Sequence, residues 1–421
     1  MPVSRPTTSV VVPYYDAPGQ LDLLLTALGR QTALGSFEVV VADDGSDRPP
    51  RPPDGLPYSC TVVRQDDRGF RAAAARNLGA ASASGDVLLF LDGDVVPTAT
   101  YVQRMTDAVR RTDDGHGVLV VGRRRHFRRS PTATGSVLAL PDDGDGPLPP
   151  GIRIDPDPAW LSDGYRRTDN LRQAGDEDFR LVISAVVGSD RRMWDATGGF
   201  DASFVGYGGE DWDLGWRSWL SGADWRHVPN AVAWHDGPDA GARAISTADK
   251  NAETIRLAST VPLPSARGTG LIHEVPAVAV RYHGPVIDDD AEAADAADAA
   301  VIDCVAGLLD RADAGVWFPG LRGRDQLPPL LREDTRVHAG DVPGRVLARA
   351  PFTVDIHRPL RLSVPLPAFC AAGDRVVPGW ITARHTRSAH RGVRPDVVDA
   401  ERAGLRAIDA QLSLERRWGG W

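Results

Sequence analysis

The N-terminal half of the chain alternates short apolar runs with amphipathic segments, and this alternation limits the folds open to it. From Ser9, "SVVVPYY" predicts a buried strand, "GQLDLLLTALGRQ" a helix and "FEVVVADDGS" a second strand that ends in a turn. The strand "CTVVRQ", an Ala-rich helix from Phe70 to Ser84 and the apolar run "VLLFL" come next. This order is typical of an α/β fold with a largely parallel sheet and helices on both faces, in which ligands bind at the carboxyl ends of the strands.

The apolar run "VLLFL" ends abruptly in Asp92, Gly93 and Asp94. Residues two apart in an extended segment face the same way, so both carboxylates can present oxygens to one point, and Gly93 leaves the approach open. Hard cations such as Mg²⁺ or Mn²⁺ take carboxylate oxygens and share their remaining positions with phosphates. Most Asp-x-Asp triplets are solvated turns, so the interpretation depends on the neighbouring motifs.

Composition excludes several classes of protein. The 421 residues suffice for two or three domains, and the net charge of −9 argues against a binder of nucleic acid or anionic membranes. The three cysteines form no CxxC pair, so neither a disulfide framework nor a Cys-ligated zinc is indicated. No apolar run approaches the ~20 residues of a membrane span. We therefore expect a cytoplasmic protein, and the Ala, Gly and Pro abundance with a single lysine suggests a GC-rich bacterial genome.

Four motifs in order carry a resemblance to a known family. The chain reads "ADDGS", then "ARNLG", then "VLLFLDGD", and later "GGFDASFVGYGGEDWD". The first three resemble the family 2 glycosyltransferases of the GT-A fold. The last is similar to the GGED element of bacterial chondroitin and hyaluronan polymerase domains and of the β-1,4-galactosyltransferases. The resemblance covers Ser9 to Asp239 and implies a nucleotide-sugar donor, with UDP expected, and a divalent cation, Mn²⁺ or Mg²⁺.

The resemblance also implies roles for individual residues on the donor side. The proposed donor-binding residues are Pro13, Tyr15, Asp44 with Asp43 as its alternative, Arg76, Asp92 and Gly93. The proposed metal ligands are Asp92, Asp94 and His235, where His235 comes after the GGED element at the family's interval. His227 lacks that match, and Asp236 is an alternative to its neighbour. Taken alone, "DDG" is an ordinary acidic turn and a single His is more often structural.

The "GYGGEDWD" element predicts the acceptor side. Gly208 and Gly209, like Gly206, allow unusual backbone angles close to a ligand, and a helix is expected from Glu210 to Gly222. By resemblance, Asp211 is the general base of an inverting enzyme, kept ionised by the helix terminus. Tyr207, Gly208, Gly209 and Glu210 are the proposed acceptor-binding residues. Compensation of the helix dipole by Asp211 and core packing by Tyr207 are the simpler alternatives.

The predicted function is therefore metal-dependent, inverting transfer of a sugar to a hydroxyl of a glycan, a lipid-linked glycan or a secondary metabolite. A retaining GT-A transferase and a non-catalytic carbohydrate- or nucleotide-binding protein remain as alternatives. The retaining enzyme would not need a carboxylate at Asp211. A non-catalytic protein would be free to lose the acidic set, which this chain keeps.

The remaining regions give coarser predictions. The cluster "RRRHFRR" (123–129) is expected as a solvated loop, or alternatively as a grip for an anionic acceptor. The tract 130–178 is expected to be irregular. We place the glycosyltransferase domain in residues 1–260 and an α/β accessory region in 261–421. The strand–helix–strand order of that region suggests a degenerate copy of the first domain.

Overall fold

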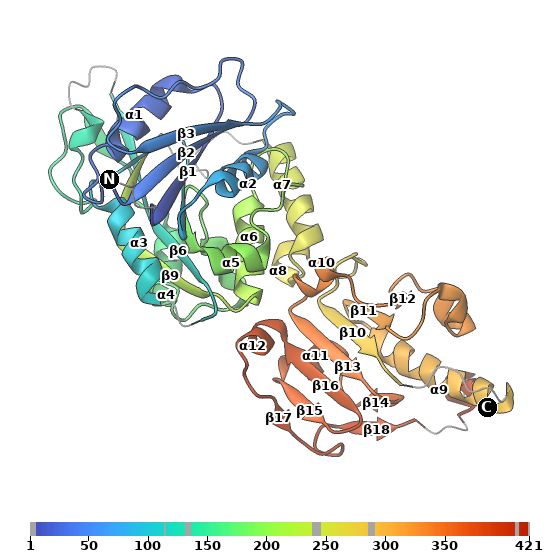
Figure 1. Ribbon diagram of the computed structural model, residues 1–421. Coiled ribbons are helices and arrows are strands. Elements are labelled where there is room, and N and C mark those ends of the chain that lie inside the picture. Colours follow the sequence, from blue (N-terminus) through green and yellow to red (C-terminus); the bar gives the residue numbers. More distant parts are fainter. Residues whose placement is uncertain are drawn as a thin grey trace. The chain divides into compact units, whose positions relative to one another are not determined.

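The computed structural model describes residues 6–112, 115–130, 136–237, 246–284, 291–408 and 412–419. The chain divides into two compact units, Met1–Leu257 and Ala258–Trp421, here called the N-terminal and C-terminal units (Figure 1). Among the described helices, none has the length and apolar character needed to cross a membrane. Cys60, Cys304 and Cys370 are free thiols.

The N-terminal unit is a nine-stranded mixed sheet with the order β3-β2-β1-β4-β8-β6-β9-β5, and β7 pairs with β6. The strands are β1 (Thr8–Tyr14), β2 (Phe37–Asp43), β3 (Ser59–Arg64), β4 (Val87–Leu91), β5 (Val95–Pro97), β6 (Val118–Arg129), β7 (Ile152–Ile154), β8 (Val186–Asp190) and β9 (Asp224–Asp236). The first four strands run parallel, and β8 is antiparallel to both β4 and β6. Strands β1 and β4 are almost wholly buried, which explains their continuous apolar sequence.

Helices cover both faces of this sheet, as expected for the predicted α/β fold. Gly79 of α2 packs so closely on Val11 that an added Cβ would lie 2.4 Å from its Cγ1 atom. The Thr106 hydroxyl of α3 hydrogen-bonds to that of Thr8 at 2.9 Å. Because Thr8 and Val11 are an odd number of residues apart on β1, α2 and α3 lie on opposite faces. The helices are α1 (Pro18–Leu28), α2 (Ala72–Ser82), α3 (Tyr101–Thr112), α4 (Ala159–Arg167), α5 (Arg191–Thr197), α6 (Glu210–Leu220) and α7 (Thr247–Thr260), with 3₁₀ turns η1 (Val137–Ala139) and η2 (Asp176–Leu181).

The structure corrects two predictions for the middle of this unit. The cluster 123–129 is not a loop, because it forms the second half of β6 and pairs with β9 and β7. The tract 130–178 is not wholly irregular, since it contains β7 and α4. Arginines in a strand need acidic neighbours to be half-buried, and the tract supplies them: Asp157 bonds to Arg123 at 3.1 Å and pairs with Arg125 at 3.2 Å.

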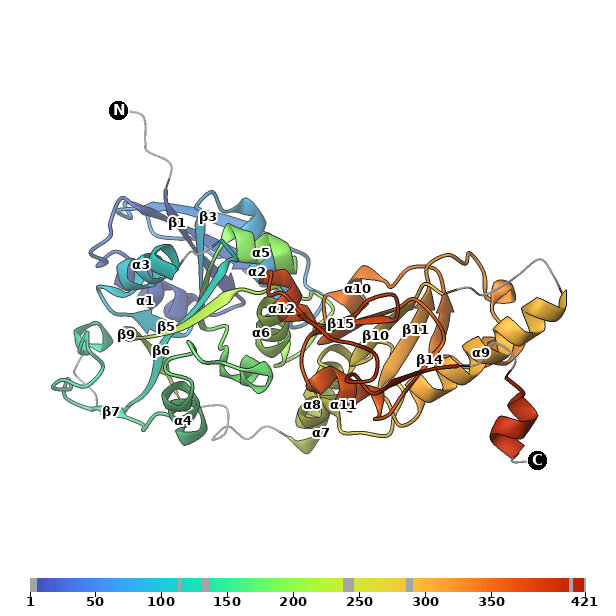
Figure 2. The same ribbon diagram turned by 90° about the horizontal axis from the view of Figure 1, so that it is seen from below.

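The C-terminal unit has a seven-stranded sheet with the order β12-β11-β10-β13-β16-β15-β17, and a separate pair β14-β18. Its strands are β10 (Val278–Tyr282), β11 (Ala314–Phe318), β12 (Val337–Ala339), β13 (Phe352–Ile356), β14 (Leu360–Leu362), β15 (Arg375–Val377), β16 (Ile381–His385), β17 (Asp396–Val397) and β18 (Leu405–Ala407). The other elements are α8 (Pro264–Arg267), α9 (Ala291–Leu309), α10 (Gly344–Leu347), α11 (Leu366–Ala371), α12 (Thr386–His390), η4 (Arg324–Gln326), η5 (Pro329–Arg332) and the π-turn η6 (Glu415–Gly419). The long helix α9 lies beside β11 and β14 (Figure 2), where Val301 and Val305 join the core of the unit.

Candidate active site

A cavity of about 610 Å³ opens in the N-terminal unit where β4 ends and α6 begins. Its walls come from α2, the segment 177–185, the glycine-rich turn 207–209 and α7. Of the residues predicted from the sequence, the cavity is lined by Arg76, Asp92, Tyr207, Gly208, Gly209, Glu210 and Asp211. Side chains from motifs more than 100 residues apart therefore face one space, at the carboxyl end of a central strand.

The "ARNLG" motif is explained by three separate contacts of α2. Gly79 allows the close approach to β1 described above. The Asn77 side chain donates to the carbonyl of Phe200 at 2.7 Å and accepts from its N–H at 2.9 Å, which fixes the segment before α6. Arg76 points to the cavity and is 3% exposed. The motif thus positions an arginine and one wall of the site together.

Arg76 joins the two acidic motifs. Its Nη2 atom donates to Asp92 at 2.6 Å, and its Nη1 atom donates to Glu210 at 3.1 Å. The ring of Phe200 lies 5.2 Å from the guanidinium carbon. Burial alone would lower the pKa of Arg76, but Asp92 and Glu210 together raise it. The side chain is therefore a permanent cation between the end of β4 and the start of α6.

Asp211 lies beside Glu210 in the first turn of α6. Its Oδ1 atom accepts from the Trp212 N–H at 2.9 Å, and its Oδ2 atom faces the Ser184 N–H at 3.4 Å. Burial, assisted by the charge of Glu210, raises the pKa of Asp211 to about 7, although Arg76 and the two N–H groups oppose the shift. The sequence predicted that the helix terminus keeps this carboxylate ionised, but burial raises its pKa more than the helix terminus lowers it. A pKa near neutral suits a group that takes up a proton during turnover.

The glycines before α6 allow a turn that other residues could not form without strain. Gly206, Gly208 and Gly209 have φ angles of 93°, 88° and 91°. An added Cβ at Gly208 would lie 2.8 Å from the Glu253 carboxyl carbon of α7. The sequence predicted that this glycine allows the backbone to approach a ligand, but the structure shows that it makes room for the Glu253 side chain of α7.

Three large aromatic side chains line the cavity while remaining exposed: Phe70, Trp160 and Tyr207, with exposed fractions of 51%, 47% and 46%. Phe70 and Tyr207 contact each other with ring centroids 6.4 Å apart. Tyr207 is thus not a core residue. Two of these residues were not predicted from the sequence: Phe70, which lies two residues before α2, and Trp160, which lies in the tract expected to be irregular.

Asp94 and His235 are brought together by strand pairing. Strand β5 begins directly after Asp94 and pairs antiparallel with β9, so that Val95 lies opposite His235. The Asp94 Oδ2 atom is 3.0 Å from the His235 Nε2 atom. His126 of β6, a residue not predicted from the sequence, packs against His235 with ring centroids 4.9 Å apart. Of the alternative residues, Asp236 lies next to this pair, because its N–H donates to the Asp94 carbonyl at 3.2 Å while its side chain is exposed. His227 lies elsewhere, with its ring stacked on Tyr165 at 3.7 Å.

The chemistry of this pair fits a divalent cation, since Mn²⁺ takes both carboxylate and imidazole ligands. Within the described ranges, however, no three His, Cys, Asp or Glu side chains converge as a ready cluster. Asp92, the other predicted ligand, accepts a hydrogen bond from Arg76 through its Oδ1 atom.

The predicted base-binding residues differ in access. Tyr15 is 49% exposed and Pro13 is partly buried, whereas Asp43 and Asp44 are 0% and 4% exposed. Asp43 accepts from the N–H and hydroxyl of Ser46 and pairs with Arg64 at 2.9 Å. Asp44 accepts from the Arg71 N–H at 2.7 Å and from the Gln65 amide. Both carboxylates thus hold the loops after β2 and β3.

The arginine cluster of β6 divides between the two faces of the sheet. Besides their contacts with Asp157, both Arg123 and Arg125 pair with Asp145, at 3.1 Å and 2.9 Å respectively. Arg128 pairs with Asp155 at 2.7 Å. Arg124 alternates to the other face, where it lines the cavity. Three arginines of the cluster are therefore already matched by carboxylates.

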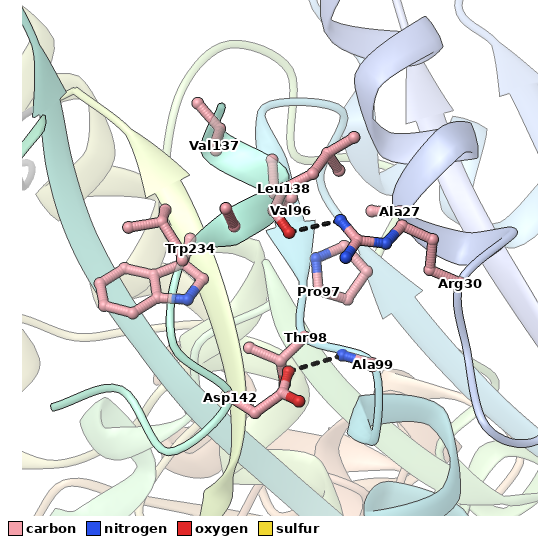
Figure 3. Close-up of a pocket in the computed structure, with 12 residues that line it drawn as sticks. Ala27, Arg30, Val96, Pro97, Thr98, Ala99, Val137, Leu138, Asp142 and Trp234 are labelled. Carbon is pink, nitrogen blue, oxygen red and sulfur yellow. Dashed lines mark hydrogen bonds between the residues drawn. The ribbon is translucent and has the colours of Figure 1, made fainter. Parts of the chain in front are cut away.

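A second, smaller cavity of about 250 Å³ lies between the end of α1, β5 and η1. Figure 3 shows Trp234 and Arg30 at this cavity, with Asp142 accepting from the Ala99 N–H. None of the predicted site residues lines it. Trp234 precedes His235 on β9, so the two side chains point to opposite faces, and this cavity is separate from the Asp94–His235 pair.

Comparison with known proteins agrees with the motifs. Residues 9–154 match the model of Glycosyl transferase family 2, and residues 177–235 match the model described as the N-terminal domain of galactosyltransferase. Chondroitin synthase of Escherichia coli is 28% identical over 246 residues, covering 55% of this chain and 34% of that protein. Validoxylamine A glucosyltransferase of Streptomyces hygroscopicus subsp. jinggangensis is 33% identical over 241 residues, covering 50% of this chain and 51% of the relative.

The chain thus spans 34% of the length of the first relative and 51% of the length of the second. Among solved structures, GalNAc-T7 with UDP, GalNAc and Mn²⁺ aligns with a TM-score of 0.39 at 17% identity, covering 58% of this chain and 46% of that one.

Proposed function

Because the chain carries a family 2 glycosyltransferase domain, we propose that it transfers a sugar from a nucleotide-diphosphate donor, a UDP-sugar, to an acceptor hydroxyl with inversion. The acceptor is a glycan or a secondary metabolite. The observation that carries the proposal is the placement of Asp211 and Asp92 in one cavity. A proton acceptor and a carboxylate of the Asp-x-Asp motif then face the same substrate space.

On the donor side, Tyr15 and Pro13 are proposed to contact the base. Asp44 remains the proposed acidic contact and would exchange its Gln65 partner for the ligand. Asp43, which has no exposed surface, would act by holding the turn at Ser46. Gly93 leaves room for the diphosphate, since an added Cβ there would meet only the Pro13 carbonyl at 3.6 Å.

For the metal, we propose Asp94 and His235 as fixed ligands and Asp92 as the third. A divalent cation bound by these residues would neutralise the charge that develops on the departing diphosphate. His235 is 3% exposed and is held by its strand neighbours, so its imidazole is oriented before any ligand arrives.

On the acceptor side, Tyr207, Phe70 and Trp160 offer apolar faces on which a sugar ring can stack. Glu210, Gly208 and Gly209 line the cavity next to Asp211. Asp211 would accept the proton of the attacking hydroxyl, because its raised pKa makes it a competent base near neutral pH. Attack on the face opposite the diphosphate gives a β-glycoside from an α-linked donor.

A panel of nucleotide sugars, scored by protection against thermal unfolding with and without Mn²⁺, tests the donor and the metal without knowledge of the acceptor. We expect UDP and one UDP-sugar to raise the melting temperature in the presence of Mn²⁺. If no nucleoside diphosphate protects the protein, the proposal fails. The anomeric configuration of the product decides between inversion and the retaining alternative.

A further inference from the structure

We propose that Arg76 couples the donor side of the site to its acceptor side, because it is shared between Asp92 and Glu210. This inference rests on the proposed function, in which Asp92 binds the metal-diphosphate. It assigns to Glu210 a positioning role that reaches the donor through Arg76. The guanidinium of Arg76 would interact more strongly with Asp92 in the absence of the metal and more strongly with Glu210 when the metal is bound.

Arg76 bonds to Asp92 and Glu210 at the same time. Its two terminal nitrogens contact carboxylates 16 and 134 residues away in the sequence, at 2.6 Å and 3.1 Å. The guanidinium is almost fully buried and packs on Phe200, which Asn77 in turn fixes to α2. Arg76 therefore has little freedom to leave either partner for solvent. A change in its interaction with one carboxylate alters the strength of its interaction with the other.

The charges show why sharing matters. One buried cation faces two carboxylates, so the group carries a net negative charge before any ligand binds. A divalent cation at Asp92 competes directly with Arg76 for that carboxylate. Glu210 offers Arg76 a second anionic partner and so lowers the cost of releasing Asp92 to the metal. Without the charge of Glu210, Arg76 would be committed to Asp92, and metal binding would weaken.

The same linkage acts in reverse. Once the metal holds Asp92, Arg76 strengthens its contact with Glu210 and fixes the first turn of α6, where Asp211 begins the acceptor site. Thermodynamic linkage requires that a donor-bound site then favours the acceptor-competent arrangement by the same factor. Donor and acceptor binding should therefore strengthen each other by one factor, whichever binds first.

The test is a double-mutant cycle in the full chain, with Mn²⁺ and UDP as probes. Mn²⁺ binding is monitored by loss of the free-ion electron paramagnetic resonance signal, and UDP binding by calorimetry. We expect Glu210→Gln to weaken Mn²⁺-dependent UDP binding about 5- to 20-fold, within the range of typical coupling energies. In the Arg76→Lys background, where one nitrogen replaces the two that contact the two acids, the same substitution should change binding by less than about twofold.

Glu177→Gln is the matched control. Glu177 lines the same cavity but pairs with Arg180, so the substitution removes one negative charge without touching Arg76. Binding and thermal unfolding close to those of wild type are expected for this exposed pair. Glu210→Gln and Arg76→Lys disturb a buried ion pair and should lower the melting temperature of the ligand-free protein, so binding is measured well below the melting temperature of each variant. Equal affinity in wild type and Glu210→Gln, or the same loss in the Arg76→Lys background, would overturn the coupling alone. A wild-type protein that binds no UDP with Mn²⁺ would overturn the proposed function as well.

Discussion

The two units share the order of their central strands but differ in the residues at the carboxyl ends of those strands. In the N-terminal unit, β3-β2-β1-β4 run parallel and β8 is antiparallel to β4. In the C-terminal unit, β12-β11-β10-β13 run parallel and β16 is antiparallel to β13. This correspondence supports the proposal that the second unit is a degenerate copy. Strand β4 leads into Asp92-Gly93-Asp94, whereas the equivalent strand β13 leads into His357-Arg358-Pro359.

The charge balance at the two edges also differs. In the C-terminal unit a single carboxylate, Asp355, contacts both Arg281 and His283 at 2.8 Å. In the N-terminal unit a single arginine, Arg76, contacts two carboxylates. Asp355 is thus already paired with two basic side chains, whereas the excess of carboxylate around Arg76 is compatible with the proposed cation. The fold is therefore compatible with both edges, and the side chains at the strand ends decide which one carries chemistry.

The largest expected effect concerns Asp211, which belongs to the proposed acceptor side of the cavity in the N-terminal unit. Asp211→Asn keeps the shape of the side chain but cannot accept a proton. We expect transfer to fall ~10²- to 10⁴-fold, as is typical for loss of a general base. UDP release from the donor identified in the nucleotide-sugar panel measures this, and calorimetry should show unchanged UDP binding. Turnover near the wild-type rate would contradict the assignment of Asp211 as the base.

The second prediction compares the two strand ends directly. Asp94→Ala removes a proposed metal ligand, so Mn²⁺-dependent UDP binding should weaken by more than the ~10- to 100-fold that loss of an outer-shell partner costs. His357→Ala changes the equivalent edge of the C-terminal unit and should leave the same binding within about twofold. Calorimetry on both variants measures the two affinities. Equal losses would mean that the two edges do not differ in function.

The third prediction concerns pH. Because the pKa of Asp211 is raised to about 7, transfer should fall about tenfold per pH unit below that value and reach a plateau above it. The effect on stability has the opposite sense. The ordinary pKa of an unfolded Asp is about 3.9, so the stability associated with protonated Asp211 is complete below that pH and is lost as the pH rises through about 7.

Asp211→Asn cannot ionise at this position, so it does not lose stability as the pH rises through about 7. It should therefore melt at a higher temperature than wild type at pH 8, and the difference should disappear near pH 4. Thermal unfolding of both proteins across this range is the measurement. A lower melting temperature for the variant at pH 8 would contradict the raised pKa and favour a carboxylate that stabilises the helix terminus.

The sequence predicted the fold class and the family resemblance, because both depend on local patterns of residues. Apolar strands ending in "DDGS" and "DGD" indicated which edge of the sheet bears polar groups. What could not be predicted was pairing between distant segments: Arg76 with Glu210, or Phe70 with Tyr207. The prediction for the cluster 123–129 was wrong because its acidic partners, Asp145 and Asp157, lie in a tract without a recognisable pattern.

The smallest expected effect concerns the glycine turn before α6, which lines the proposed acceptor side of the cavity. Gly206 and Gly208 have similar positive φ angles, so alanine at either position meets the same backbone strain of roughly 1–2 kcal/mol. They differ in space: an added Cβ at Gly206 would meet nothing nearer than 3.7 Å, whereas at Gly208 it would lie 2.8 Å from the Glu253 carboxyl carbon.

Gly208→Ala should therefore lower the free energy of unfolding by more than Gly206→Ala, but by no more than about 1 kcal/mol, because the Glu253 carboxylate is the end of a flexible side chain that can move aside. Urea denaturation of the two variants measures the difference, with Gly19→Ala as a control, since Gly19 lies near the start of α1 with open space and no positive φ angle. If the two turn variants were equally stable, the contact with α7 would be dispensable. The turn would then keep its shape through its backbone angles alone, and the contact between Gly208 and α7 would add nothing to its stability.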